Sequence, residues 1–235
     1  MDLRTKRSRS PIGKANTFKQ QAYHLIKTRI MNRELRPSQY ITDSQIAKQL
    51  NISRTPVREA LHLLEHEGLL TRQTKPGWKI HSLSLEDINE IFDVKVALEG
   101  MMVRRAAESV DEGKRTALRN TMGRMKQAAS VGDHEAWRQA DIELHHTISD
   151  MCGNERASRI ISDLNDQWYR LRVGLVAMEG RVERSNHEHE EIVSYILDGR
   201  GIEAEHQMFN HLNNLRQELV RVLVNLVLPF AENGI

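Results

Sequence analysis

The chain has 235 residues, of which 39% are hydrophobic, so it can form one large domain or two ordinary ones with a packed core. No stretch of apolar residues is long enough to span a bilayer, and the single Cys152 excludes an intrachain disulfide framework. We therefore expect a soluble, cytoplasmic protein without a membrane partner, in which Cys152 is a small core residue.

The net charge of +2 conceals a strong asymmetry along the chain. Residues 1–80 hold 16 Lys and Arg against 6 Asp and Glu, a net charge of +10, whereas residues 81–235 hold 18 against 26, a net charge of −8. A basic segment can neutralise phosphates and an acidic one is repelled by them, so nucleic-acid contact is expected at the N-terminal end. Residues 1–16 read as a disordered basic arm, either a DNA contact or a plain solvated tail.

Two short helices are predicted between residues 42 and 67. Thr42 and Gln45 form a capping-box pattern that begins the first, and Ser53 is a good N-cap for the second. Apolar residues then recur at helical spacing, which predicts that one face of the second helix is buried. The opposite face carries polar and basic residues suited to phosphate and base contacts: Arg54, Thr55, Arg58 and His62. The pair predicts a helix-turn-helix with a recognition helix.

A two-stranded wing is predicted directly after this helix. Gly68 can end the helix, and the β-prone segments 70–72 and 78–80 flank a turn that contains Lys75, Pro76 and Gly77. Residues 17–81 are thus expected to form a winged helix-turn-helix domain.

This part of the chain resembles the DNA-binding domain of GntR-family bacterial transcription regulators. The resemblance lies in the order of the helices, the run from Ser53 to Leu61 and the wing with glycine at its tip. The resemblance implies that Arg54 and Arg58 read bases and that Ser53 and Thr55 hold phosphates. It also implies that Lys75 and Gly77 bring the wing tip to the DNA. The alternative for the two arginines is a solvated helix face. Ser38 departs from the family, which usually has Gly there.

The remainder of the chain is predicted to be all-α. After a linker at residues 82–84, Ser84 and Asp87 form a near capping box, and helical periodicity runs to Pro229. Helices are expected at 85–109, 112–130, 134–151, 155–176, 186–198 and 202–228, punctuated by glycines, with a tail at 230–235. The fold class is therefore all-α dominated, with a small β wing and an antiparallel helical bundle over residues 85–229.

Helical phase selects four candidate metal ligands from the bundle. Asp141 and His145 are four residues apart on the apolar stripe of their helix, and His189 and His211 lie in phase with apolar residues of theirs. A buried aspartate is costly unless it is paired or bound to metal, although a single inward histidine is more often an ordinary core residue. Three imidazoles and one carboxylate suit Zn²⁺, with Ni²⁺, Mn²⁺ or Fe²⁺ as alternatives.

The bundle resembles the FCD-like effector-binding domain of the FadR-type subfamily of GntR regulators, through Asp141, His145, Gly153, His189 and His211. A cation in an apolar cavity attracts a small carboxylate, which is therefore the expected effector. In this subfamily an Arg commonly lies near the site on the first bundle helix, where this chain has Lys95. Lys95 and Arg172 are the candidate effector contacts, with a structural ion pair as the alternative for each.

These features together predict a ligand-responsive regulator, most often a repressor in this family, and not an enzyme. The resemblance and the geometry of paired major grooves predict a homodimer on a pseudo-palindromic, double-stranded DNA operator. Two alternatives remain open: a constitutive DNA-binding protein whose bundle only dimerises, and a metal-dependent hydrolase in which the four ligands form a catalytic centre.

Overall fold

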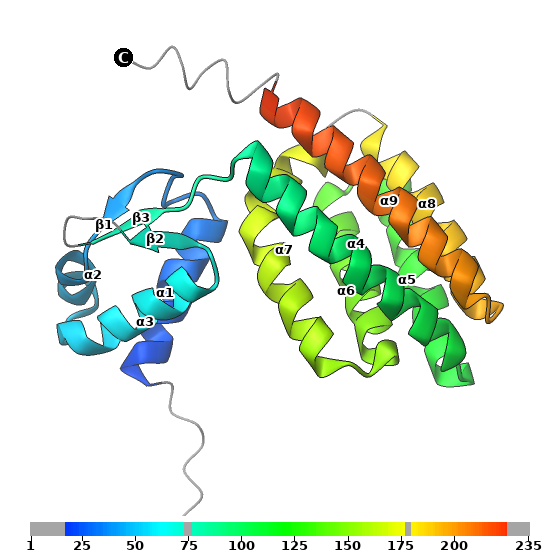
Figure 1. Ribbon diagram of the computed structural model, residues 1–235, viewed down its shortest axis with the longest axis horizontal. Coiled ribbons are helices and arrows are strands. Elements are labelled where there is room, and N and C mark those ends of the chain that lie inside the picture. The colour runs from blue at the N-terminus through cyan, green and yellow to red at the C-terminus, as the bar shows by residue number, and fades with distance from the viewer. Residues whose placement is uncertain (1–16, 73–76, 177–179, 225–235) are drawn as a thin grey trace, which may run out of the picture. The chain divides into compact units, whose positions relative to one another are not determined.

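A computed structural model describes residues 17–72, 77–176 and 180–224, with the side chains of residues 169–176 excepted. The chain divides into two compact units, with the boundary along the sequence between His81 and Ser82 (Figure 1). The predicted basic arm, the tail at 230–235 and the wing-tip residues Lys75 and Pro76 lie outside the described residues.

The first unit packs three helices against a small sheet (Figure 1). Capping boxes begin two of its helices, Thr17 with Gln20 and, as predicted, Thr42 with Gln45. Ser53 is the N-cap residue of the third helix, as predicted, although its side chain makes no capping hydrogen bond. The elements are α1 (Phe18–Met31), β1 (Tyr40–Ile41), α2 (Asp43–Leu50), α3 (Arg54–His66), β2 (Leu70–Arg72) and β3 (Trp78–Ile80).

The sheet has one strand more than the predicted wing. The wing strands β2 and β3 pair antiparallel as expected, and β1 pairs antiparallel with the other edge of β3, which gives the order β1-β3-β2. A strand of two residues is too short to show a periodic pattern in the sequence. Its partner strand also lies far along the chain, so no local turn signal reveals the pairing. Ser38, which precedes β1, has φ 64°, the left-handed conformation that explains the preference for Gly at this position.

The second unit is a helical bundle in which α9 runs alongside α4 and α8 (Figure 1). Ser84 and Asp87 form the predicted capping box at the start of α4. Buried apolar side chains of α4, α5, α6, α8 and α9 form one continuous core, and Cys152 is buried beside it with Met102 and Ile161. The helices are α4 (Leu85–Glu108), α5 (Glu112–Ser130), α6 (His134–Cys152), α7 (Glu155–Val176), α8 (Arg181–Leu197) and α9 (Gly201–Val222).

Two helices of the bundle begin at other residues than predicted. Helix α8 begins at Arg181, five residues before the expected 186, so that Arg181 and Ser185 belong to the bundle. Gly201, expected in a connection, is the first residue of α9, where a Cβ atom would lie 3.0 Å from the carbonyl oxygen of Arg104. Close packing against α4, not a turn, accounts for this glycine. Within the described ranges, no helix combines the length and apolar character needed to cross a membrane.

Candidate DNA-binding surface and metal centre

The exposed face of α3 carries both predicted base-reading arginines. The side chains of Arg54 and Arg58 are 59% and 53% exposed, and each is bound to Asp43 at the start of α2. Arg54 donates to Oδ1 of Asp43 from Nη2 at 2.9 Å, and Arg58 donates to Oδ2 from Nη2 at 2.8 Å. A second donor of each guanidinium, Nε, completes two-point contacts at 3.2 and 3.1 Å. One carboxylate therefore holds both arginines on the same side of the recognition helix.

Asp43 is the component of this surface that sequence reasoning missed. It is buried, and burial alone would raise the pKa of its carboxyl group. Hydrogen bonds from Arg58 and Arg54 reverse that effect, so the pKa is lower than usual and the group is ionised. The only sequence signal is an acidic residue in the first turn of α2, a common helix feature that does not identify its partners.

The other predicted contacts are placed as follows. Ser53 and Thr55 are exposed at the N-terminal end of α3, where backbone N–H groups favour a phosphate. Gly77 adjoins β3 with φ 147°, and a Cβ atom there would lie 2.4 Å from the ring of Tyr40. The structure thus gives Gly77 a packing role that the sequence did not suggest. Lys75 lies outside the described residues.

Three histidines converge in the bundle from three helices, His145 on α6, His189 on α8 and His211 on α9. Each offers one nitrogen, and these three atoms lie within 4.8 Å of one another. The side chains of His189 and His211 are almost completely buried, and that of His145 is 22% exposed. By contrast, the side chain of His187, two residues before His189, is 75% exposed. The inward phase expected for the three histidines matches this arrangement.

Asp141, the fourth predicted ligand, lies beside two of the histidines. Its Oδ1 is 3.5 Å from Nε2 of His189 and 3.9 Å from Nε2 of His145. A cation bound between these atoms would replace direct contacts of this kind with bonds of ~2.0–2.2 Å to each ligand. Asp141 is 2% exposed, and a buried carboxylate is favourable only where a partner such as a bound cation compensates its charge.

Each histidine is also held at its other ring nitrogen. Nδ1 of His145 lies 3.1 Å from Glu99, Nδ1 of His189 lies 3.4 Å from the Ser185 hydroxyl, and Nδ1 of His211 lies 2.7 Å from Glu188. Metal-binding histidines typically make such a contact, because it fixes the ring and leaves the second nitrogen for the metal. The residues present therefore fit a divalent cation with borderline N and O ligands, as expected for Zn²⁺ or a related metal.

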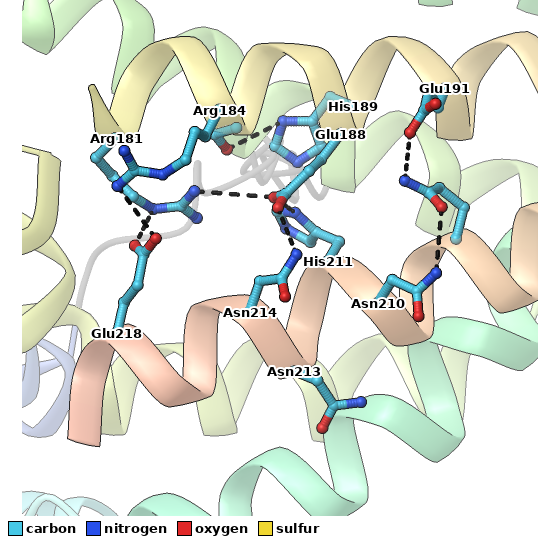
Figure 2. Close-up of polar contacts among 12 residues, drawn as sticks. Arg181, Arg184, Glu188, His189, Glu191, Asn210, His211, Asn213, Asn214 and Glu218 are labelled. Atoms are coloured by element: carbon cyan, nitrogen blue, oxygen red, sulfur yellow. Dashed lines mark hydrogen bonds and ion pairs between the residues drawn. The ribbon is translucent and has the colours of Figure 1, made fainter. Parts of the chain in front are cut away.

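A charged network between α8 and α9 supports His211 (Figure 2). Glu188 accepts hydrogen bonds from His211 and from Asn214, the latter at 2.8 Å, and lies 3.8 Å from Arg181. Burial raises the pKa of Glu188, but the contacts with His211, Asn214 and Arg181 together outweigh it, so the net pKa is lowered. Burial also lowers the pKa of His211, against the opposing effect of Glu188. His211 is thus favoured in the neutral form that binds metals.

Two buried cations line a small chamber of about 30 Å³ beside the histidines. Lys95 on α4, 3% exposed, contacts Glu99 and donates to Oδ1 of Asn165 at 2.6 Å. Arg181 on α8, 5% exposed, lies 2.9 Å from Glu218 through Nε, while its buried Nη1 makes no hydrogen bond. Arg181 was missed because α8 was expected to begin later. The side chain of Arg172 is outside the described residues.

Comparison with known proteins decides the family. Residues 18–80 match the model of the bacterial regulatory proteins of the gntR family, and residues 90–214 match that of the FCD domain. The chain belongs to the GntR family of bacterial regulatory proteins. It is a DNA-binding transcription regulator with an FCD domain, not an enzyme, so the hydrolase alternative is set aside.

The relatives match both units of this GntR regulator. The uncharacterized HTH-type transcriptional regulator YdhC of Bacillus subtilis is 28% identical over 90% of the chain and 95% of its own length. The HTH-type transcriptional repressor RspR of Escherichia coli is 21% identical over 86% of the chain and 89% of its own. The solved structure of E. coli McbR/YncC shares the fold with a TM-score of 0.71 and 18% identity, covering 87% of this chain and 98% of that one.

Proposed function

We propose that this GntR regulator is a repressor whose operator binding is controlled by a small carboxylate at a divalent metal held by Asp141, His145, His189 and His211. The observation that carries this proposal is the convergence of three histidine nitrogens within 4.8 Å, each ring held from behind by a second side chain. Zn²⁺ is the first candidate for the metal, followed by Ni²⁺, Mn²⁺ and Fe²⁺. We propose repression and not activation because the relative RspR is named a transcriptional repressor.

The chamber beside the histidines supports a carboxylate as the effector. A bound metal would supply positive charge and an open coordination position there. Lys95 and Arg181 add two buried cationic groups to the lining of the same chamber. Nη1 of Arg181 is buried, makes no hydrogen bond and lies 3.8 Å from Oε2 of Glu188, so a carboxylate oxygen would give it a closer acceptor. We therefore add Arg181 to Lys95 and Arg172 as a proposed effector contact.

Operator binding is proposed to use a homodimer, with one recognition helix in each of two successive major grooves. Arg54 and Arg58 would contact base edges, and Ser53, Thr55 and the wing, including Lys75 and Gly77, would contact the backbone and minor groove. Effector binding needs a coupling energy of only ~1–3 kcal/mol to change operator occupancy.

Elemental analysis of the purified protein without an affinity His tag tests the metal site. We expect about one metal ion per chain, as one four-ligand site requires. His189→Ala should lose it, while the matched control His187→Ala should keep it because His187 is exposed on the same helix. Absence of metal after reconstitution, or retention by His189→Ala, would contradict the proposal. Operator affinity that ignores both chelator and carboxylates would instead favour a constitutive DNA-binding protein.

A further inference from the structure

A second cavity of about 250 Å³ adjoins the histidine cluster. Side chains of α4, α6, α7 and α9 line it, and it shares two lining residues, His145 and Asn165, with the smaller chamber. Those two residues therefore mark the place where the two cavities adjoin. The 22% exposure of the His145 side chain contrasts with the near-complete burial of the other two histidines.

The inner surface of this cavity is mainly apolar. It is formed by three aliphatic and two methionine side chains from four helices: Met102, Val103, Ile148, Ile161 and Met208. All five are 7% exposed or less. Apolar lining of this kind favours hydrocarbon over hydrated groups, and methionine side chains adapt to irregular ligand shapes.

The rim of the cavity carries acceptor groups. Asp150, which is exposed, and Asp166, which is half-buried, line it together with hydroxyl groups, two of which, on Ser149 and Ser158, are hydrogen bonded to each other at 2.5 Å. Among its lining residues in the described part of the chain there is no Lys or Arg. A carboxylate at this rim would meet like charge, and the described lining residues include no Lys or Arg to offset it.

The smaller chamber holds little more than the head of an effector. Its 30 Å³ corresponds to about the space of two or three water-sized groups, on the scale on which one such group needs ~10–15 Å³. Any effector larger than a carboxylate with a methyl group must therefore extend beyond it. The adjoining cavity, which meets the chamber at His145 and Asn165, offers the space.

We propose that this cavity holds the apolar tail of the effector, which is a monocarboxylic acid with a short hydrocarbon chain. This inference rests on the proposed function, because the carboxylate head is placed in the chamber beside the metal ligands. The apolar lining selects the tail, and the acidic rim excludes a second carboxylate at its far end. The ligand class is thus narrower than organic acids in general and excludes dicarboxylates of the same length.

Calorimetric titration of the metal-loaded, full-length protein with acetate, butyrate, hexanoate and adipate tests this ligand class. Each methylene buried from acetate to hexanoate should raise affinity roughly threefold to fourfold. Adipate has the same carbon chain as hexanoate but a second carboxylate, and it should bind no more tightly than acetate. Equal affinities of acetate and hexanoate, or tighter binding of adipate than hexanoate, would overturn the tail cavity and leave the proposed function standing. Failure of all four acids to bind would overturn both.

A pair of neighbouring variants locates the tail. Ile161→Phe adds volume inside the cavity and should lower hexanoate affinity at least tenfold while leaving acetate affinity and metal content unchanged. Ile160→Phe is the matched control, because Ile160 is 46% exposed and does not line the cavity. Unchanged hexanoate binding by Ile161→Phe would overturn the placement. If this variant does not fold, the chain-length series in the unaltered protein still decides the proposal.

Discussion

Asp43 links two arginines of the recognition helix, so its removal tests how the reading surface is organised. Asp43→Ala leaves the guanidinium groups of Arg54 and Arg58 without their shared acceptor. We expect binding to a selected operator to weaken by ~1–3 kcal/mol, because directed base contacts depend on fixed side chains. Binding to a scrambled duplex should persist or increase, since a negative charge has been removed.

The measurement for Asp43→Ala is fluorescence anisotropy with both duplexes at several salt concentrations. Glu59→Ala is the control, because Glu59 is an exposed acid on α3 and its loss changes the net charge by the same amount. If Asp43→Ala and Glu59→Ala change the affinity for each duplex by the same amount, Asp43 acts through its charge alone.

Asp43 also gives the first unit a predictable response to acid. Its pKa is lowered in the folded state, where hydrogen bonds from Arg58 and Arg54 overcome the effect of burial. Its stabilising contribution is therefore fully present above the unfolded pKa of about 3.9 and is lost as the pH falls through the lowered folded pKa. Urea unfolding should show Asp43→Asn less stable than the parent at pH 6, with the difference shrinking as the pH is lowered through the acid range below the unfolded pKa. A constant difference across that range would contradict this account.

Glu188 tests whether residues behind the histidines tune the metal site. Its carboxylate holds Nδ1 of His211 at 2.7 Å without belonging to the proposed ligand set. Glu188→Gln should lower metal affinity by about 10- to 100-fold, the usual effect of losing such a partner. Competition with a chromogenic chelator measures this. The control Glu183→Gln changes an exposed residue of the same helix, and equal metal affinities in the two variants would remove Glu188 from the site.

At the scale of elements, most of the fold could be predicted because local signals and burial agree. The capping boxes at Thr42 and Ser84 fixed two helix starts, and alternating β-prone residues fixed both wing strands. Helical phase placed His189 and His211 in the interior. Each of these predictions depends on residues that lie within a few positions of one another in the sequence. Periodicity and capping patterns describe relations over that distance.

The parts that could not be predicted depend on register between distant elements. The pairing of β1 with β3 and the contact of Asp43 with α3 are decided by how segments pack. The same holds for Glu99 and Glu188 behind the histidines, because no spacing within one helix specifies the partner helix. Arg181 was missed for a local reason: Gly180, with φ 69°, begins α8 without a side-chain cap.

The wing depends on a close approach between Gly77 and β1. A Cβ atom at Gly77 would lie 2.4 Å from the ring of Tyr40, and the φ of 147° is unfavourable for any other residue. Gly77→Ala should therefore lower the unfolding free energy by ~1–3 kcal/mol. Gly123→Ala should instead raise it by ~0.5–1 kcal/mol, because Gly123 is exposed within α5 and nothing lies near its Cβ position. Thermal unfolding of both variants gives the comparison, and similar shifts would contradict the close-packing explanation.

At the scale of the whole molecule, the opposite net charges, +10 for residues 1–80 and −8 for residues 81–235, separate two tasks along one chain. Attraction to phosphates is confined to the unit with the recognition helix, and the acidic unit carries the histidine cluster. The proposed control of DNA binding by an effector therefore requires energetic coupling between two units that would bind chemically different ligands.

Thermodynamic linkage makes this coupling measurable from both ends. If a carboxylate lowers operator affinity by some factor, the operator must lower carboxylate affinity by the same factor, which for ~1–3 kcal/mol is about 5- to 150-fold. We expect equal factors from operator titrations with and without hexanoate and from hexanoate titrations with and without operator. The coupling should disappear in His189→Ala, which cannot position the head group, and persist in His187→Ala. Carboxylate binding with no effect on operator affinity would separate ligand binding from DNA control and contradict the regulatory proposal, because a ligand that binds both states equally cannot shift them.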